Sequence, residues 1–337
     1  MTQSLSTRQL GPFTVASIGL GCMNLSHAYG VPPSEEVANQ ILEKAFELGV
    51  THFDSAALYG LGNNETLLSK QFLKRHRQQI TLISKGGVGP ADGKRVIDSR
   101  PESLRRDIEG SLKRLQTDVI DLYYLHRWDK KVPIEDAIGT LGDFVNEGKV
   151  RAIGMSEISA QTLRKGHATY PISALQTEYS MWTRNPEIAL LKTCRELGIS
   201  FVAFSPVARG FLSQTPLNIV EFPEKDIRRG MPRFFAENFS KNLAFYEAMK
   251  KIAVDENCTL AQLALAWLLH QGSDITVIPG TSRLDHLQEN IAADHVKLSA
   301  PTLERISQVL DNVPISGNRY NEVSQAEVDT EQYPAYS

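Results

Sequence analysis

The chain has 337 residues, of which 42% are hydrophobic, 22% charged and 8% aromatic. This length and composition fit a globular protein with a sizeable core, and they exclude a minimal disulfide scaffold and a disordered chain. With 36 Lys and Arg against 39 Asp and Glu, the formal net charge is -3, which offers a nucleic acid no electrostatic footprint. We therefore expect no nucleic-acid partner.

The N-terminal sequence contains no basic stretch followed by an apolar segment, and the chain has no run of 18 apolar residues. We therefore expect a cytoplasmic protein without a membrane association. The three cysteines, Cys22, Cys194 and Cys258, are far apart in the sequence, and none belongs to a CxxC pair. This spacing predicts free thiols and no metal site.

A short apolar run followed by an amphipathic stretch recurs along the chain, which predicts alternating strands and helices. Near-continuous apolar strands are typical of a parallel sheet that is covered on both faces. The predicted strands are residues 15–22, 50–56, 80–85, 119–126, 150–156, 172–179, 199–205 and 274–280. The predicted helices are residues 34–48, 64–75, 100–115, 135–147, 159–169, 186–197, 240–254 with 259–271, and 283–292. Helix ends are predicted from Ser34 and Ser159 as N-caps and from Gly49, Gly148 and Gly198 just after the last turn.

Eight βα units in 337 residues favour a (β/α)8 barrel, or TIM barrel, over a doubly wound sheet, which usually has about six strands. We predict a single-domain barrel over residues 1–311 and a polar C-terminal tail over residues 312–337. Residues 206–239 form a long, proline-containing stretch after the seventh strand. Because long βα loops lie at the catalytic face of a barrel, this stretch is a candidate lid or cofactor clamp.

Ionisable side chains stand where three consecutive predicted strands end, and barrel enzymes place their chemistry at those ends. Asp54, Lys85 and His126 end the second, third and fourth strands, and Tyr59 follows the second. A carboxylate, an ammonium, an imidazole and a phenol together suit proton transfer to a developing alkoxide. A lysine charge lowers the pKa of a nearby phenol, and a carboxylate keeps the lysine charged. We therefore expect Tyr59 to act as an acid near neutral pH.

From about residue 7 to about residue 310, the sequence resembles the aldo-keto reductase superfamily. The segments GVTHFDSAALYG, LISK and DLYYLHRWD are similar to those that carry the catalytic Asp, Tyr, Lys and His of that family. The segments GMSE, QTEYSMWTR, FVAFSPVARGFL and VIPGTSRLDHLQEN are similar to its nicotinamide-cofactor segments, in the same order. The resemblance implies that Asp54, Tyr59, Lys85 and His126 are catalytic and that a carbonyl group is reduced by NADPH, without a metal.

The resemblance also implies a cofactor site across the barrel mouth. Ser156 and Gln176 would hold the carboxamide, and Phe204 would stack on the nicotinamide, where many relatives have Tyr or Trp. The implied pyrophosphate segment is Ser205, Val207, Arg209, Gly210 and Leu212. The implied adenosine-phosphate segment is Gly280, Thr281, Ser282, Arg283, Gln288, Glu289 and Asn290. Within it, Ser282 and Arg283 begin a helix and suit a 2′-phosphate, because guanidinium binds such groups with two hydrogen bonds.

Two positions depart from the better-studied branches of the superfamily. Glu157 stands where those branches have Asn, and Gly280 stands where they have Lys. Both residues resemble the bacterial, plant and yeast branch that includes pyridoxal reductases and perakine-reductase-like proteins.

The leading interpretation is an NADPH-dependent reductase of aldehydes and ketones, with Tyr29 and Trp128 as candidate substrate contacts. Trp128 could equally cap the rim of the barrel, and Tyr29 has the same status. A Schiff-base aldolase or lyase is an alternative, because Lys85 lies at a strand end where such a lysine would act. A second alternative is a cofactor-binding sensor or regulatory subunit with slow turnover. The sequence leaves open the substrate, the oligomeric state and whether the C-terminal tail closes over the site.

Overall fold

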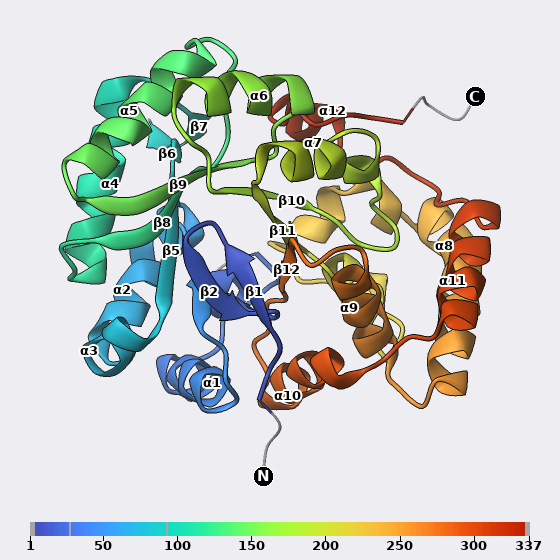
Figure 1. Cartoon of the computed structure of the whole chain (residues 1–337). Helices are drawn as coiled ribbons and strands as arrows, with labels where there is room; N and C mark the ends of the chain where they lie inside the picture. Colours follow the sequence, from blue (N-terminus) through green and yellow to red (C-terminus); the bar gives the residue numbers. More distant parts are fainter. Residues whose placement is uncertain (1–3, 27, 92–93, 334–337) are drawn as a thin grey trace.

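The architecture is a barrel of parallel strands surrounded by helices, which confirms the predicted (β/α)8 fold (Figure 1). The computed structural model describes residues 4–26, 28–91 and 94–333. A bridge between Ile18 and Val277 joins the two edges of the eight-stranded sheet. The strands, in sheet order, are β3 (Leu20–Gly21), β4 (His52–Asp54), β5 (Thr81–Gly86), β8 (Ile120–Leu125), β9 (Val150–Ser156), β10 (Ala174–Glu178), β11 (Ser200–Phe204) and β12 (Ile275–Ile278).

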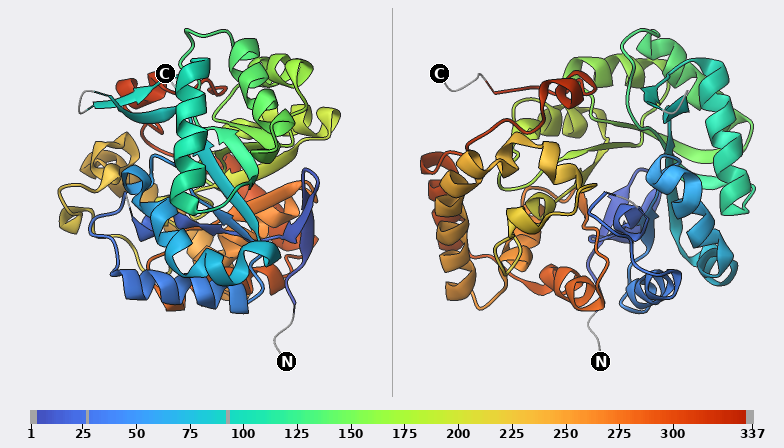
Figure 2. Two further views of the ribbon diagram at one scale, coloured as in Figure 1. Left: turned by 90° about the vertical axis from the view of Figure 1, so that its left-hand side faces the viewer. Right: turned by 180° about the vertical axis from the view of Figure 1, so that it is seen from behind.

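The helices form the outer layer in all views (Figures 1 and 2). They are α1 (Glu35–Glu47), α2 (Asn63–Lys70), α3 (Phe72–His76), α4 (Pro101–Leu115), α5 (Ile134–Asn146), α6 (Ala160–Thr169), α7 (Leu190–Leu197), α8 (Ala236–Asp255), α9 (Leu260–His270), α10 (Leu284–Ala292) and α11 (Ala300–Asn312). The predicted caps are confirmed, because Ser34 and Ser159 accept hydrogen bonds from the third residue beyond each of them. Gly49, Gly148 and Gly198 adopt the positive φ angles that favour glycine.

The prediction of one strand over residues 15–22 is wrong. Part of that run belongs to β2 (Phe13–Ala16), which pairs antiparallel with β1 (Thr7–Leu10), and only β3 enters the barrel sheet. Figure 1 shows this hairpin across the near end of the barrel. Leu10 and Val15 belong to the same core cluster as Ile83 and Leu122. The apolar run thus contributes to both the hairpin and the barrel, and its hydrophobicity does not show where one ends and the other begins.

Alternation along the strands sets which side chains meet inside the barrel. Ile83, Leu122 and Val202 form the inner cluster, whereas their neighbours Leu82, Tyr123 and Phe201 pack in the outer cluster under the helices. Because side chains alternate between the two faces of a strand, the inner positions recur every second residue. Continuing that pattern to the C-terminal strand ends places Lys85 and His126 at the mouth.

Several segments differ from the sequence-based expectation. After β5 the chain forms a hairpin of β6 (Val88–Ala91) and β7 (Lys94–Ile97). The predicted helix over 64–75 is interrupted between α2 and α3, and α11 was not predicted. The long stretch after β11 contains four 3-10 turns before α8 begins at Ala236. Beyond α11, the tail includes α12 (Glu322–Ala326) and lies beside the β6–β7 hairpin, as the left view of Figure 2 shows.

Within the described ranges, no single helix has the length and apolar character needed to cross a membrane. The helices α8 and α9 pass that test of length and composition only as a pair, which is bent by 86°.

Candidate active site

A cavity of about 730 Å³ lies at the C-terminal mouth of the barrel, which is within the roughly 300–1,000 Å³ typical of small-molecule pockets. Its walls come from the strand ends, the stretch after β11, the start of α10 and the tail. The sequence-predicted residues that line it are Tyr29, Asp54, Tyr59, His126, Ser156, Gln176, Phe204, Ser205, Val207, Arg209, Gly210, Gly280, Thr281, Ser282, Arg283, Glu289 and Asn290. The structure therefore brings most of the predicted site together.

Lys85 lies behind the cavity wall and is fully buried. Its Nζ donates hydrogen bonds to the Asp54 carboxylate, to the Ser55 carbonyl oxygen at 2.9 Å and to the Tyr59 hydroxyl oxygen at 3.2 Å. The other Asp54 oxygen accepts a hydrogen bond from the Gln176 amide at 2.8 Å. We call Asp54, Tyr59, Lys85 and the neighbouring His126 the Tyr59 cluster.

The expected fall in the pKa of Tyr59 does not occur. Burial raises the pKa of this phenol and outweighs the nearby Lys85 charge, so the pKa lies above its ordinary value of 10. Burial also opposes the charge on Lys85, but the Asp54 and Tyr59 interactions prevail and raise its pKa. At neutral pH, Tyr59 therefore carries its proton and Lys85 carries its positive charge.

His126 completes the cluster at the end of β8. Its ring lies edge-on to that of Tyr59, with 5.8 Å between the ring centroids. Burial, followed by the charges of Arg127, Lys85 and Arg95, lowers the pKa of His126 well below its ordinary value. The imidazole is therefore neutral, and it can donate one hydrogen bond toward a substrate oxygen.

The predicted pyrophosphate segment has an unusual backbone. Ser205, Ala208 and Arg209 all have φ between 50° and 57°, which is uncommon for residues other than glycine. This conformation turns the chain sharply just after β11, where Phe204 ends the strand. The turn brings Ser205, Val207, Arg209 and Gly210 to the cavity wall.

The predicted 2′-phosphate residues lie at the start of α10. The Arg283 backbone N–H donates to Thr281 Oγ1 at 3.0 Å, and the helix has no side-chain N-cap bond. The Arg283 guanidinium pairs with Asp285, and the two side chains are 63% and 60% exposed. Arg283 therefore faces solvent at the cavity rim, where an anion would compete with Asp285 for it.

Besides Lys85, three predicted residues do not line the cavity, and one candidate substrate contact does. Leu212 is buried away from the cavity and Gln288 is exposed outside it. Trp128 does not line the cavity, because its indole N–H donates to the Val132 carbonyl at 2.7 Å and its side chain packs against the core. Tyr29 does line it, with the Arg228 guanidinium carbon 5.0 Å from the centre of its ring. Tyr29 thus lies next to the stretch 206–239.

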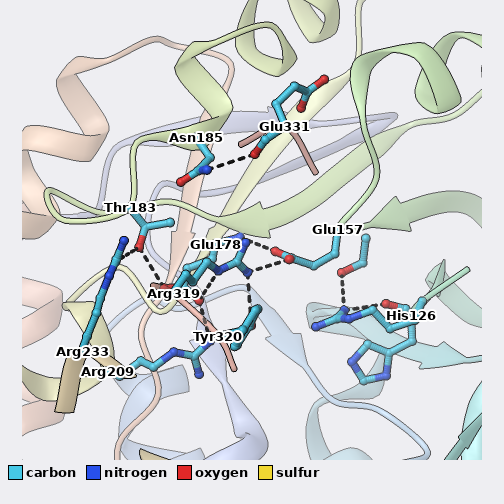
Figure 3. A network of polar contacts seen from close by, with 12 residues as sticks. His126, Glu157, Glu178, Thr183, Asn185, Arg209, Arg233, Arg319, Tyr320 and Glu331 are labelled. Carbon is cyan, nitrogen blue, oxygen red and sulfur yellow. Dashed lines mark hydrogen bonds and ion pairs between the residues drawn. The ribbon is translucent and has the colours of Figure 1, made fainter. Parts of the chain in front are cut away.

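A second buried cluster was missed by the sequence analysis (Figure 3). Arg319 of the tail donates to Glu157 at 2.6 Å and to Glu178 at 3.1 Å. Arg209 also pairs with Glu178, and both arginines bond the Tyr320 hydroxyl. We call these five residues the Arg319 cluster. The one signal in the sequence was Glu157 itself, because its partner Arg319 is 162 residues away.

Other cavity-lining residues that sequence reasoning missed include Arg95, Arg127 and Arg228. Among the described residues, no group of three or more His, Cys, Asp and Glu side chains is arranged to hold a metal ion. The expectation that the protein needs no metal stays a prediction. Cys22, Cys194 and Cys258 are free thiols.

Comparisons with known proteins agree with the fold. The family model "Aldo/keto reductase family" matches residues 17–311. The chain is similar to "Aldo-keto reductase yakc [NADP(+)]" of Schizosaccharomyces pombe, with 44% identity over 94% of this chain and 95% of that protein. It is 42% identical to "Probable aldo-keto reductase 1" of Glycine max, over 91% and 89% of the two chains. A glycerol dehydrogenase structure from Gluconobacter oxydans shares the fold, with a TM-score of 0.83, 22% identity and coverage of 93% and 97%.

The barrel, the cluster at its mouth and these matches define an oxidoreductase of the carbonyl-reducing class. The chain belongs to the aldo-keto reductase family.

Proposed function

We propose that this protein reduces aldehydes and ketones to alcohols with NADPH, and that Tyr59 supplies the proton. The observation that carries the proposal is the 3.2 Å contact between the Tyr59 hydroxyl and the Lys85 ammonium, at the wall of the cavity that Ser156, Gln176 and Phe204 also line. A phenol that keeps its proton at neutral pH lies beside a cation that stabilises the phenolate left after proton transfer.

The residues of the cavity fit a nicotinamide dinucleotide phosphate. The Ser156 hydroxyl and the Gln176 amide suit the carboxamide, and Phe204 offers a face for stacking. The α10 start offers uncapped N–H groups, which favour an anion there, and Ser282 and Arg283 beside it suit the 2′-phosphate. When bound, the cofactor supplies the hydride. The name of the Schizosaccharomyces pombe relative, which includes NADP(+), supports this choice of cofactor.

Each member of the Tyr59 cluster has a separate part in the reaction. Tyr59 donates its proton to the carbonyl oxygen as the alkoxide develops. Neutral His126 donates a hydrogen bond to the same oxygen and so orients the substrate. Lys85 remains charged and stabilises the phenolate, while Asp54 holds the Lys85 ammonium in place. The burial of Lys85 strengthens these interactions, because water does not screen them.

The surroundings of Lys85 disfavour the Schiff-base alternative. A Schiff-base lysine attacks as a neutral amine and must reach its substrate. Lys85 is fully buried, is paired with Asp54 and has a raised pKa. The regulatory alternative differs from the reductase in its rate of turnover. A sensor would oxidise its bound NADPH slowly and would not turn over a carbonyl substrate repeatedly.

The test is a turnover assay with a panel of carbonyl compounds: pyridoxal, aromatic aldehydes, methylglyoxal and simple ketones. NADPH oxidation and the alcohol product are measured together. We expect many turnovers, with one alcohol formed per NADPH, and no turnover for Tyr59→Phe. A substrate adduct trapped on Lys85 by borohydride, without NADPH oxidation, would establish the Schiff-base enzyme instead. A single slow turnover would support the regulatory subunit.

A further inference from the structure

Five arginines of the described part of the chain line the cavity, and they differ in their partners. Arg209 pairs with Glu178, Arg228 with Asp226 and Arg283 with Asp285. Arg95, on the β6–β7 hairpin, pairs with Glu327 of the tail. Arg127 has no carboxylate partner among the residues that the structure describes. Within the described ranges, Arg127 is thus the arginine of the cavity wall whose charge is not matched by an ion pair.

Arg127 lies at the reacting end of the cavity, directly after His126. Its Nη1 donates to the His126 carbonyl oxygen at 2.6 Å and to the Ser156 hydroxyl at 3.2 Å. These bonds fix the guanidinium but occupy only one of its three nitrogens, while the group offers five N–H donors. Its charge contributes to the lowered pKa of His126 and opposes the rise in that of Tyr59. The positive potential of Arg127 therefore extends to the place where the substrate carbonyl must lie.

Arg95 adds to this potential, although its charge is partly offset. The Arg95 and Glu327 side chains are 37% and 30% exposed, and ion pairs open to solvent are weak. Arg95 also contributes to the lowered pKa of His126. In the Tyr59 cluster, the charge of Lys85 is already matched by Asp54. The balance of charge at this end of the cavity is positive.

We propose that Arg127 is a specificity residue that binds an anionic group of the substrate, either a carboxylate or a phosphate, while the substrate carbonyl faces Tyr59. This inference rests on the proposed reductase function and narrows its substrate class. Guanidinium recognises both groups through paired, charge-assisted hydrogen bonds. Glu327 weakens this anion binding, because its carboxylate partly neutralises the charge of Arg95.

The first experiment compares substrates that differ in charge alone. We measure kcat/KM for 4-carboxybenzaldehyde and for its methyl ester, and for glyceraldehyde 3-phosphate and glyceraldehyde. The wild type should prefer the anionic member of at least one pair. A preference in the first pair indicates carboxylate recognition, and a preference in the second indicates phosphate recognition. In Arg127→Gln, that preference should fall about tenfold, at the lower end for a charge-assisted contact. The ratio cancels any effect through Ser156, since both members of a pair use the same cofactor site.

Matched variants sharpen the comparison. Arg106→Gln, which removes the same charge from a side chain that is 69% exposed on α4, should leave the preference unchanged. Glu327→Gln should raise the preference, because it frees Arg95 and removes a carboxylate from the cavity wall. Added salt should lower the preference of the wild type. An opposite or absent response to Glu327→Gln would remove the tuning role of that residue.

A binding measurement separates this inference from the proposed function. With NADP⁺ present, 4-(hydroxymethyl)benzoate and its methyl ester are titrated calorimetrically into the wild type and Arg127→Gln. Tighter binding of the carboxylate that is lost in the variant supports the inference, even without turnover. If the wild type shows no preference for the anion, or if Arg127→Gln keeps that preference, the inference is overturned. Reduction of the methyl ester of 4-carboxybenzaldehyde, the neutral aldehyde of the first experiment, would then still support the reductase.

Discussion

Two buried charge clusters adjoin the cavity, and they are built in opposite ways. The Tyr59 cluster comes from the ends of three neighbouring strands, β4, β5 and β8, and from the turn after β4. Asp54, Tyr59 and His126 line the cavity. The Arg319 cluster joins β9 and β10 to the stretch after β11 and to the tail. The first cluster depends on the barrel alone, whereas the second holds covering segments onto it.

The Tyr59 cluster therefore serves the proposed reaction, whereas the Arg319 cluster serves the stability of the fold. The only cation of the Tyr59 cluster, Lys85, contacts the proposed proton donor. In the Arg319 cluster, two arginines and two glutamates neutralise one another, and none contacts Tyr59 through a described hydrogen bond. We therefore expect substitutions in the first cluster to act mainly on kcat and substitutions in the second to act mainly on the free energy of unfolding.

The largest expected effect is that of Tyr59→Phe. Loss of the hydroxyl removes the proton donor, and general acid catalysis contributes roughly 10²- to 10⁴-fold, so kcat should fall by at least that range. NADPH affinity and the melting temperature should change little, because the ring and its packing remain. Steady-state kinetics and cofactor titration test this. A variant that retained about a tenth of the wild-type kcat would refute the assignment of Tyr59.

Lys85→Met should abolish reduction, and Asp54→Asn should weaken it less, because the lysine charge survives in the second variant. The pH profile gives an independent test. Since the pKa of Tyr59 lies above 10 and the protonated phenol is the active form, the wild-type rate should be constant through neutral pH and fall only in strong alkali. Normal turnover of Lys85→Met across the neutral range would show that the electrostatic role is wrong.

Arg319→Met should lower stability by about 3–5 kcal/mol, because it leaves the buried Glu157 without its ion-pair partner and Glu178 with Arg209 alone. Burial raises the pKa of Glu178, but the charges of Arg209 and Arg319 outweigh it and hold the pKa at about 2, below the ordinary 4.5. The stability from Glu178 is therefore present above pH 4.5 and lost as the pH falls toward 2. In Arg319→Met, the loss of stability in acid should begin at a higher pH, because one of the charges that lower the pKa of Glu178 is gone.

Thermal melts over a series of acidic pH values measure the effect of Arg319. The matched control is Arg305→Met, which breaks an exposed ion pair with Asp255 and should cost no more than about 1 kcal/mol. Equal shifts in the two variants would mean that the Arg319 cluster contributes no more than a surface pair.

The two clusters also differ in how far the sequence predicts them. The strand-end rule finds Asp54, Lys85 and His126, because alternation and strand length are local properties of the chain. Arg319 is joined to Glu157 and Glu178 only by tertiary packing, so no local spacing connects them. The β1–β2 hairpin was missed for a related reason: its apolar run continues directly into the barrel strand. The sequence also predicts a lowered pKa for Tyr59. That prediction is wrong because the pKa depends on how deeply the phenol is buried, which local sequence patterns do not show.

The smallest expected effect is at the adenosine end, which belongs to neither cluster. Arg283→Ala should raise the dissociation constant for NADPH and leave that for NADH almost unchanged, because the cofactors differ only in the 2′-phosphate. A charge-assisted contact contributes about 10- to 150-fold in affinity, and we expect the lower end, since Arg283 is 63% exposed and shares its guanidinium with Asp285. Gly280, where other branches have Lys, supplies no second cation to mask the loss.

Asp285→Ala should change NADPH affinity in the opposite direction to Arg283→Ala. It frees the Arg283 guanidinium and removes a negative charge, so NADPH should bind more tightly while NADH is little affected. Tryptophan fluorescence titrations of the wild type and the two variants with both cofactors measure the six dissociation constants. If Arg283→Ala weakened NADPH and NADH equally, Arg283 would stack on the adenine. If it weakened neither, the 2′-phosphate would bind elsewhere, and the exposed start of α10 would have no part in cofactor choice.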